Sequence, residues 1–261
     1  MKRKKIPIKA LPPNPNSLIF LAYRGSKSFG TYQKPTEPNS TDDIDLIGCY
    51  VNPINGYFGF NKTIPEHYAI MSGKWDCVYY EFRKMIALLA KGNPNVLASL
   101  WLPDRHIIYK HPMWDQIIGH KKLFVSKNVY SAFSGYANDQ LKKMTHLALE
   151  GYMGPKRREL VKKYGYDTKN AAHLIRLLRM GNEFLQTGEL QVDRTNIDRD
   201  QLLAIKNGGS PLGNIKTLAN RLFKIGRNLK RSSKIKNECD IKTIENLMIF
   251  LLMKHFQVGD M

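Results

Sequence analysis

Cysteine is scarce in this sequence of 261 residues, and long apolar runs are absent from it. The three cysteines, Cys49, Cys77 and Cys239, are odd in number and widely spaced. This pattern argues against a disulfide framework or a zinc site and predicts a reduced, cytoplasmic protein. No apolar run approaches the roughly 18 residues of a membrane-spanning helix. The basic start of the chain is followed by Pro-rich sequence rather than by a signal-peptide core.

Acidic residues are also few, since the sequence has 22 Asp and Glu but 41 Lys and Arg, for a net charge of +19. Such an excess predicts a polyanionic partner, for which nucleic acid is the first choice and an anionic membrane surface the alternative. We expect RNA and no membrane partner. The sequence does not indicate the oligomeric state.

Two segments concentrate this positive charge. Residues 120–163 hold ten Lys or Arg against three acids, and residues 201–237 hold nine with no acid. The second segment has apolar residues at helical spacing over 215–229, so its cations form a strip on the opposite face. The alternative is a solvated face. Only Phe223 interrupts the strip as an aromatic, which favours phosphate contacts over base stacking. The candidate nucleic-acid-binding residues are Lys216, Arg221, Lys224, Arg227, Lys230 and Arg231.

The hydrophobic pattern predicts an α+β fold in which a small sheet domain is followed by a helical one. Strands are expected at 18–23, 44–51 and 73–80. Helices are expected at 81–91, 127–150, 168–187 and 215–229, with a buried helix at 244–256. The expected domains are a loosely held basic and Pro-rich arm at 1–16, a catalytic domain at 17–115 and a helical domain with a basic surface at 116–261.

The pattern most typical of catalysis combines a Gly-Ser pair with two acids in a strand. Gly25 and Ser26 follow the first predicted strand, and Asp43 and Asp45 lie in or beside the second. Side chains alternate along a strand, so Asp43 and Asp45 share a face, whereas Asp42 points away. Two such carboxylates can hold a pair of Mg²⁺ ions, or Mn²⁺, as in nucleotidyl transfer. Backbone N–H groups of the Gly-Ser turn can hold NTP phosphates, with Lys27 as a nearby cation.

A third carboxylate commonly completes such a site from a neighbouring strand. Asp76, between Trp75 and Cys77 in an apolar strand, is the best candidate for this third metal ligand, and Glu81 is the fallback. The alternative for Asp76 is a solvent-facing residue at the start of its strand.

The predicted helix at 168–187 carries Lys169, His173 and Arg176 on one face, because they fall at i, i+4 and i+7. Their cationic side chains could contact a nucleotide; the alternatives are a solvated face and a core histidine. Tyr136 and Gln140 lie one turn apart and could contact a base. Core packing explains Tyr136 equally well.

The Gly-Ser pair followed by Asp43 and Asp45 resembles the DNA polymerase β-type nucleotidyltransferase superfamily. Further motifs resemble its predicted branch associated with RNA repair in bacteria and phages, over about residues 18–210. The motifs lie at 80–84, 92–97, 135–140, 169–178 and 187–190. The resemblance implies a polymerase β-like palm and Mg²⁺-dependent transfer of an NMP from an NTP, with RNA as the suspected acceptor. The favoured acceptor is a tRNA 3′ end under repair.

One position departs from the family's pattern. Ala98 stands where that pattern has a Glu after the Asn-Pro-x-Val-Leu run. Because of this departure, a catalytically silent RNA-binding protein of the same fold is an alternative. A further alternative is nucleotidyl transfer onto a protein hydroxyl, as in AMPylation, although a net charge of +19 gives such an enzyme little advantage.

Overall fold

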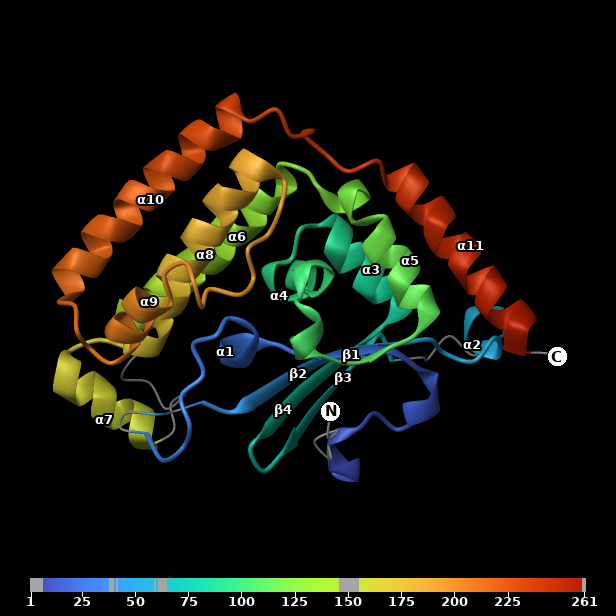
Figure 1. The fold of residues 1–261 in the computed structure, drawn as a ribbon, viewed down its shortest axis with the longest axis horizontal. Coiled ribbons are helices and arrows are strands. Elements are labelled where there is room, and N and C mark those ends of the chain that lie inside the picture. The colour runs from blue at the N-terminus through green and yellow to red at the C-terminus, as the bar shows by residue number, and fades with distance from the viewer. Residues whose placement is uncertain are drawn as a thin grey trace. The chain divides into compact units, whose positions relative to one another are not determined.

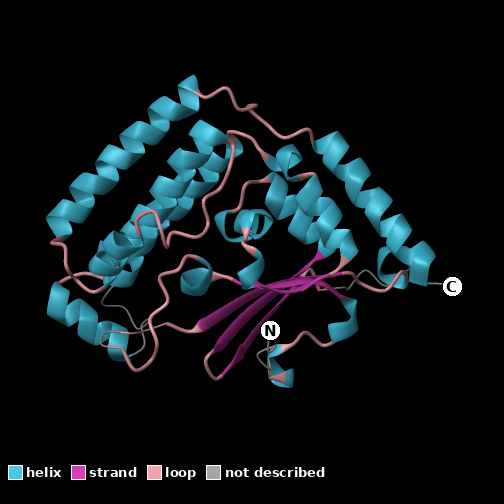
Figure 2. Ribbon diagram, viewed as in Figure 1, coloured by secondary structure: helices cyan, strands magenta, loops and turns pink. Residues whose placement is uncertain are grey.

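The structure is a computed structural model that describes residues 7–37, 40, 42–58, 60, 65–145 and 155–259 (Figure 1). Five strands form one mixed sheet in the order β3-β4-β2-β1-β5 (Figure 2). The β2–β4 pair is parallel, and the other three pairs are antiparallel. The strands are β1 (Leu18–Tyr23), β2 (Ile44–Tyr50), β3 (His67–Ser72), β4 (Trp75–Glu81) and β5 (Ile107–Lys110).

Helices make up most of the remaining regular structure. Those before the long helical segment are α1 (Gly25–Ser28), α2 (Asn55–Phe58), α3 (Phe82–Ala90), α4 (Pro94–Leu97) and α5 (Pro112–Gly119). The later ones are α6 (Asn128–Thr145), α7 (Pro155–Tyr164), α8 (Thr168–Thr187), α9 (Arg199–Lys206), α10 (Leu212–Ser232) and α11 (Ile241–Gly259). None of the helices within the described ranges combines the length and the hydropathy of a membrane span.

The chain divides into two compact units, and it passes between them more than once. The sheet unit contains the chain up to Ser28, Asp43–Phe124 and the chain from Cys239 onward. The helical unit contains Phe29–Asp42 and Val125–Glu238. These boundaries differ from the sequence-based ones. The segment Phe29–Asp42 interrupts the sheet unit, which continues to Phe124 rather than ending at residue 115. Helix α11 also belongs to the sheet unit, where it packs against α3.

The two faces of the sheet are covered by different segments. On one face, Ala10 packs in a buried cluster with Leu46, Cys77 and Tyr79, and the Tyr79 hydroxyl donates to the Ala10 carbonyl at 2.5 Å. The middle of the expected arm, at Ala10 and Leu11, is therefore packed against the sheet, whereas residues 13–16 are exposed. On the other face, the ring of Phe20 in β1 stacks on Trp114 in α5, with centroids 4.4 Å apart.

The helical unit is built around α8, which packs against α6, α9 and α10. Gly226 in α10 allows a close approach to α8. A β-carbon at this position would lie 2.6 Å from the Asn182 Oδ1 atom and 3.1 Å from the ring of Tyr130. The Asn182 amide also donates to the Leu222 carbonyl of α10 at 3.1 Å. The close approach of α10 to α8 therefore depends on the small residue at position 226, and a hydrogen bond joins the two helices there.

The predicted sheet-then-helices architecture is confirmed, with local differences. Strands β3 and β5 and helices α2, α4, α5, α7 and α9 were not predicted. The last five residues of the helix predicted at 127–150 lie outside the described residues. Helix α11 was expected to be buried because it is apolar nearly all round. Ile244 and Leu251 are indeed buried, but Ile249, Phe250 and Met253 are 51, 58 and 57% exposed. In the described part of the chain only one face of α11 is packed.

We predict that Gly226→Ala destabilises the protein, because the added β-carbon meets Asn182 and Tyr130 at the α8–α10 contact. Overpacking of this kind costs about 1–3 kcal/mol, which exceeds the roughly 0.5–1 kcal/mol that replacing a helical Gly with Ala contributes. The measurement is the free energy of unfolding from urea denaturation. Gly213→Ala, in the same helix with nothing within 4 Å of the added atom, is the control and should be neutral or stabilising. Equal effects of both substitutions would contradict the prediction.

Candidate active site

Two carboxylates lie side by side at one end of the sheet, where the interior strands β2 and β4 begin. We call this end the acidic edge. Asp45 and Asp76 are direct partners in the parallel β2–β4 pair, so their side chains project from the same face. Neighbouring strands are about 4.8 Å apart, which places these acids close together. Both side chains are partly exposed. Two adjacent carboxylates repel each other unless a cation or a proton lies between them, so their pairing favours a nearby positive charge.

The turn after β1 approaches the Asp45 carboxylate very closely. Gly25 has a φ of +63°, and a β-carbon there would lie 2.0 Å from the Asp45 Oδ2 atom. Glycine is required at this position both by the left-handed backbone and by the lack of space. Ser26 is buried, and the Ser28 hydroxyl donates to the Gly25 carbonyl at 3.0 Å. The predicted association of the Gly-Ser turn with Asp45 is therefore seen in the structure.

Cationic side chains surround this turn. The Arg24 Nη2 atom lies 3.2 Å from the Asp76 Oδ2 atom, and the Lys27 ammonium lies over the Tyr23 ring at 4.8 Å. His106 is close enough for Arg105 and Lys27 to act on it. Burial, followed by these two cations, lowers the pKa of His106 below its ordinary value. Cationic groups therefore lie beside the Gly-Ser turn, together with the carboxylates of Asp45 and Asp76. Arg24 was not singled out from the sequence, although its position directly before Gly25 was a usable signal.

Asp43 and Asp42 are neighbours in the chain with opposite environments. Asp43 is exposed just before β2. Asp42 is buried in the helical unit, where it pairs with Lys206, lies 3.5 Å from the Lys169 ammonium and accepts the Gln33 backbone N–H at 2.9 Å. The sequence-based inference that Asp42 points away from Asp43 and Asp45 agrees with these contacts.

Glu81, the fallback ligand, lies away from the carboxylate pair. It is five residues beyond Asp76 in β4, or about 16 Å along the strand, and the odd number of steps places it on the opposite face. Its carboxylate caps α3 and accepts the Tyr57 hydroxyl at 2.5 Å. The structure therefore favours Asp76 over Glu81 as the partner of Asp45.

The predicted nucleotide contacts on α8 lie in the helical unit. Lys169 faces Asp42, and burial, followed by the charges of Arg176 and Lys169, lowers the pKa of His173 well below its ordinary range. Arg176 is only 7% exposed, and its guanidinium lies 3.5 Å from the centre of the Phe29 ring. Burial and nearby Arg194 lower the Arg176 pKa to about 9.

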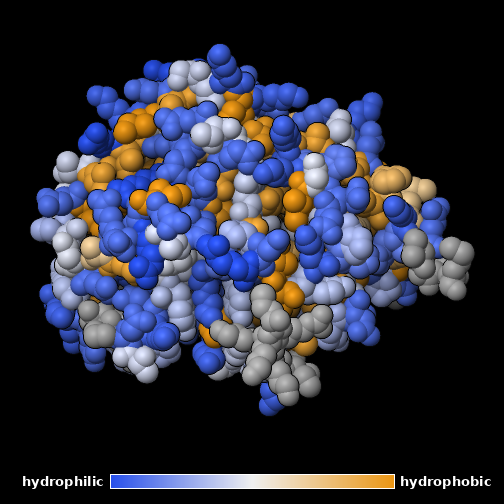
Figure 3. Space-filling view, in the orientation of Figure 1, coloured by the Kyte–Doolittle hydropathy of each residue, from blue (hydrophilic) through white to orange (hydrophobic). Residues whose placement is uncertain are grey.

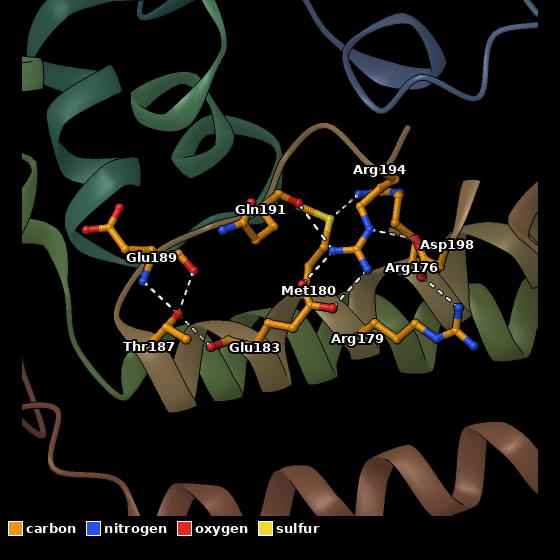
Figure 4. A network of polar contacts seen from close by, with 9 residues as sticks. All are labelled: Arg176, Arg179, Met180, Glu183, Thr187, Glu189, Gln191, Arg194 and Asp198. Carbon is orange, nitrogen blue, oxygen red and sulfur yellow. Dashed lines mark hydrogen bonds and ion pairs between the residues drawn. The ribbon is translucent and has the colours of Figure 1, made fainter. Parts of the chain in front are cut away.

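Figure 4 shows the polar network beside Arg176 in the helical unit. Arg176 donates to the Met180 sulfur at 3.3 Å, whereas fully buried Arg194 binds both Glu183 and Asp198. A nucleotide contact by Arg176 would require its side chain to leave the Phe29 ring. On α6, Tyr136 is half-buried and Gln140 is half-buried one turn later, as their predicted spacing requires.

The basic strip is exposed along α10. All six of its predicted nucleic-acid contacts are exposed, and α10 contains no acidic residue. Lys230 also lies over the Tyr130 ring at 5.1 Å. In Figure 3, hydrophilic side chains line the outer margin of α10, and hydrophobic ones lie toward α8. Because its apolar face packs on α8, the charged face of α10 has a fixed position in the helical unit.

The oxygen donors at the sheet edge suit Mg²⁺, which binds through carboxylates and water. Within the described residues, however, no three His, Cys, Asp or Glu side chains are gathered closely enough to hold one metal ion. Asp76, the third expected ligand, forms an ion pair with Arg24. The paired carboxylates of Asp45 and Asp76 are ligands of the kind that Mg²⁺ binds, although one of them has a protein cation as its partner.

A mixed sheet carrying a Gly-Ser turn and an acidic strand edge, followed by a helical region, defines a polymerase β-like nucleotidyltransferase fold. The chain matches the family model for the RNA repair pathway DNA polymerase beta family, RlaP, over residues 9–248, and it therefore belongs to that family. No curated protein matches it. The family assignment points to nucleotidyltransferase activity in RNA repair.

We predict that Asp42→Asn strongly destabilises the protein, whereas Asp43→Asn hardly changes its stability. Asp42→Asn leaves buried Lys206 without its counter-charge, and breaking a buried ion pair in this way costs about 3–5 kcal/mol. Asp43→Asn changes an exposed side chain and should alter the free energy of unfolding by less than about 0.5 kcal/mol. Urea denaturation monitored by circular dichroism compares the two variants. A stable Asp42→Asn protein would show that the buried pair is dispensable.

Proposed function

We propose that this protein transfers an NMP from an NTP to the 3′ hydroxyl of an RNA, with a tRNA under repair as the favoured acceptor. The observation that carries the proposal is the pairing of Asp45 with Asp76 beside the Gly25 turn. Family membership supports the same reaction class. The acidic edge supplies ligands for divalent metal, and the turn supplies N–H groups for phosphate within the same unit.

Asp43, Asp45 and Asp76 would hold Mg²⁺, or Mn²⁺ in its place. When bound, the metal lowers the pKa of the attacking hydroxyl and stabilises the departing pyrophosphate. The strands β2 and β4 would hold the carboxylates of Asp45 and Asp76 side by side for this metal. The two N–H groups of Gly25 and Ser26 bind phosphate oxygens, and the left-handed Gly25 backbone permits their close approach. Lys27 adds a positive charge at the same turn.

The helical unit contributes recognition in this proposal. Lys169, His173 and Arg176 would contact the nucleotide, and Tyr136 and Gln140 would contact its base. Arg176 would first have to leave the Phe29 ring, so its part in nucleotide binding stays a prediction. The exposed cations of α10 would bind RNA phosphates.

Asp43→Asn and Asp45→Asn should each abolish transfer while the protein stays folded, because neutral amides bind divalent cations much more weakly than carboxylates do. The measurement is incorporation of label from each α-labelled NTP, with Mg²⁺, into tRNA, a generic RNA or single-stranded DNA. Asp200→Asn, at a carboxylate that is 96% exposed, is the control and should keep wild-type activity.

The same assay distinguishes the alternatives. Label in protein rather than RNA would indicate an AMPylation-like reaction. No transfer by the wild type, with RNA binding retained, would indicate a silent RNA-binding protein. Ala98 favours that outcome, because it is buried at 7% exposure and carries no carboxylate where the family's pattern has one. Wild-type rates in Asp43→Asn or Asp45→Asn would reject the assigned site.

Changing Lys224, Arg227 and Lys230 together to Gln should weaken RNA binding without regard to sequence. Each phosphate contact releases counterions, and its loss reduces the log–log salt slope by about 0.7–0.9. The triple variant should therefore lose roughly two to three contacts from that slope. Lys91, Lys122 and Lys242, exposed cations of the sheet unit, form the matched control triple. An unchanged slope in the α10 variant would show that the strip is only a solvated face.

A further inference from the structure

Arg24 places a positive charge among the carboxylates of the candidate site. It directly follows β1, and its backbone N–H donates to the Asp45 carbonyl at 3.0 Å. Since Asp45 pairs with Asp76 across the β2–β4 ladder, Arg24, Asp45 and Asp76 occupy one row across three adjacent strands. The row lies at the same edge as the Gly25 turn.

The side chain of Arg24 crosses this row. Two strand spacings separate β1 from β4, or about 9.6 Å, which an extended arginine can span. The Arg24 Nη2 atom reaches the Asp76 Oδ2 atom at 3.2 Å, although β2 with Asp45 lies between their strands. The guanidinium therefore supplies positive charge where the two paired carboxylates need it.

This ion pair is poorly suited to a purely structural role. The Arg24 and Asp76 side chains are 22 and 37% exposed, and a single pair with that exposure adds little to stability. The Arg24 Nε–H is nevertheless buried without an acceptor among the described residues. A guanidinium has five N–H donors that match phosphate oxygens in pairs. Arg24 thus retains unused donor capacity beside the turn that would bind phosphate.

We propose that Arg24 is an exchangeable counter-ion. In the nucleotide-free protein it neutralises Asp76. When a metal–NTP complex binds, the metal takes over Asp76 and the guanidinium moves to the triphosphate. This inference rests on the proposed function, since it requires that the acidic edge bind a metal–nucleotide complex. The exchange keeps the site's charge balanced in both states, because one cation replaces another at Asp76 while Arg24 gains a phosphate partner.

The test measures metal and nucleotide binding separately, without turnover. Mn²⁺ binding to the nucleotide-free protein is followed by electron paramagnetic resonance. Arg24→Gln removes the competing cation, so Mn²⁺ should bind more tightly, on the order of tenfold, which corresponds to about 1.4 kcal/mol of removed repulsion. Binding of a non-hydrolysable ATP analogue with Mg²⁺ should weaken by about 10- to 100-fold, the usual loss for a charged hydrogen bond.

Three further variants make the result decisive. Arg24→Lys keeps the charge and should retain the wild-type affinity for Mn²⁺ while only partly restoring analogue binding. Arg83→Gln changes an arginine in the first turn of α3, beyond the far end of β4 and beside Tyr57, and should behave as wild type. Asp45→Asn tests the site itself and should abolish Mn²⁺ binding in any background.

The outcomes separate the two proposals. If Asp45→Asn abolishes Mn²⁺ binding but Arg24→Gln leaves both affinities unchanged, the metal site stands and the exchange is wrong. Weaker Mn²⁺ binding in Arg24→Gln would likewise overturn the exchange, because it would make Arg24 a support for the ligands rather than their competitor. If Asp45→Asn leaves Mn²⁺ binding intact, or the wild type binds no Mn²⁺, the proposed function fails and the exchange fails with it.

Discussion

The parallel pairing of β2 with β4 is the constraint on which the candidate site depends. It sets Asp45 beside Asp76 one strand spacing apart, at an edge where neither carboxylate is deeply buried. Repulsion between them requires a nearby positive charge. Arg24 supplies one, and the close approach of Gly25 to Asp45 leaves no room for a side chain there. The arginine and the glycine that follow β1 thus suit the pair of carboxylates that strand pairing brings together.

The path of the chain explains why the Gly-Ser turn and Asp43 are far apart in sequence. Phe29–Asp42 leaves the sheet unit and folds with the helical unit. Asp42 ends this excursion in a buried pair with Lys206, and burial lowers the Lys206 pKa although Asp42 opposes the shift. The next residue, Asp43, is exposed at the start of β2. The two adjacent aspartates therefore have different roles. Asp42 holds the segment Phe29–Asp42 in the helical unit, and Asp43 lies exposed at the start of β2.

Local patterns were enough to predict β1 and α8 with their observed bounds. Strand alternation predicted only that Asp43 and Asp45 share a face, whereas the pairing of Asp45 with Asp76 is set by the strand register. The features that were not predicted depend on residues far away in the sequence, which a local pattern does not contain. Strand β3 alternates between exposed and half-buried residues and pairs, among the described strands, with β4 alone, so its apolar signal is weak. The role of Arg24 requires the register of three strands. Conversely, the all-round apolar pattern of α11 predicted burial, but packing on α3 covers only one face.

Some basic residues of this chain are buried and others are exposed, and composition alone does not predict which residues are buried. Arg194 is fully buried because Glu183 and Asp198 together satisfy its guanidinium at 2.5–2.8 Å. The cations of α10 are exposed in a helix without a single acid. A buried charge needs partners within the fold, whereas an exposed strip without acids leaves its counter-charges to the solvent. The net charge of +19 therefore bears on partners only through side chains such as those of α10, whose counter-ions a polyanion can displace.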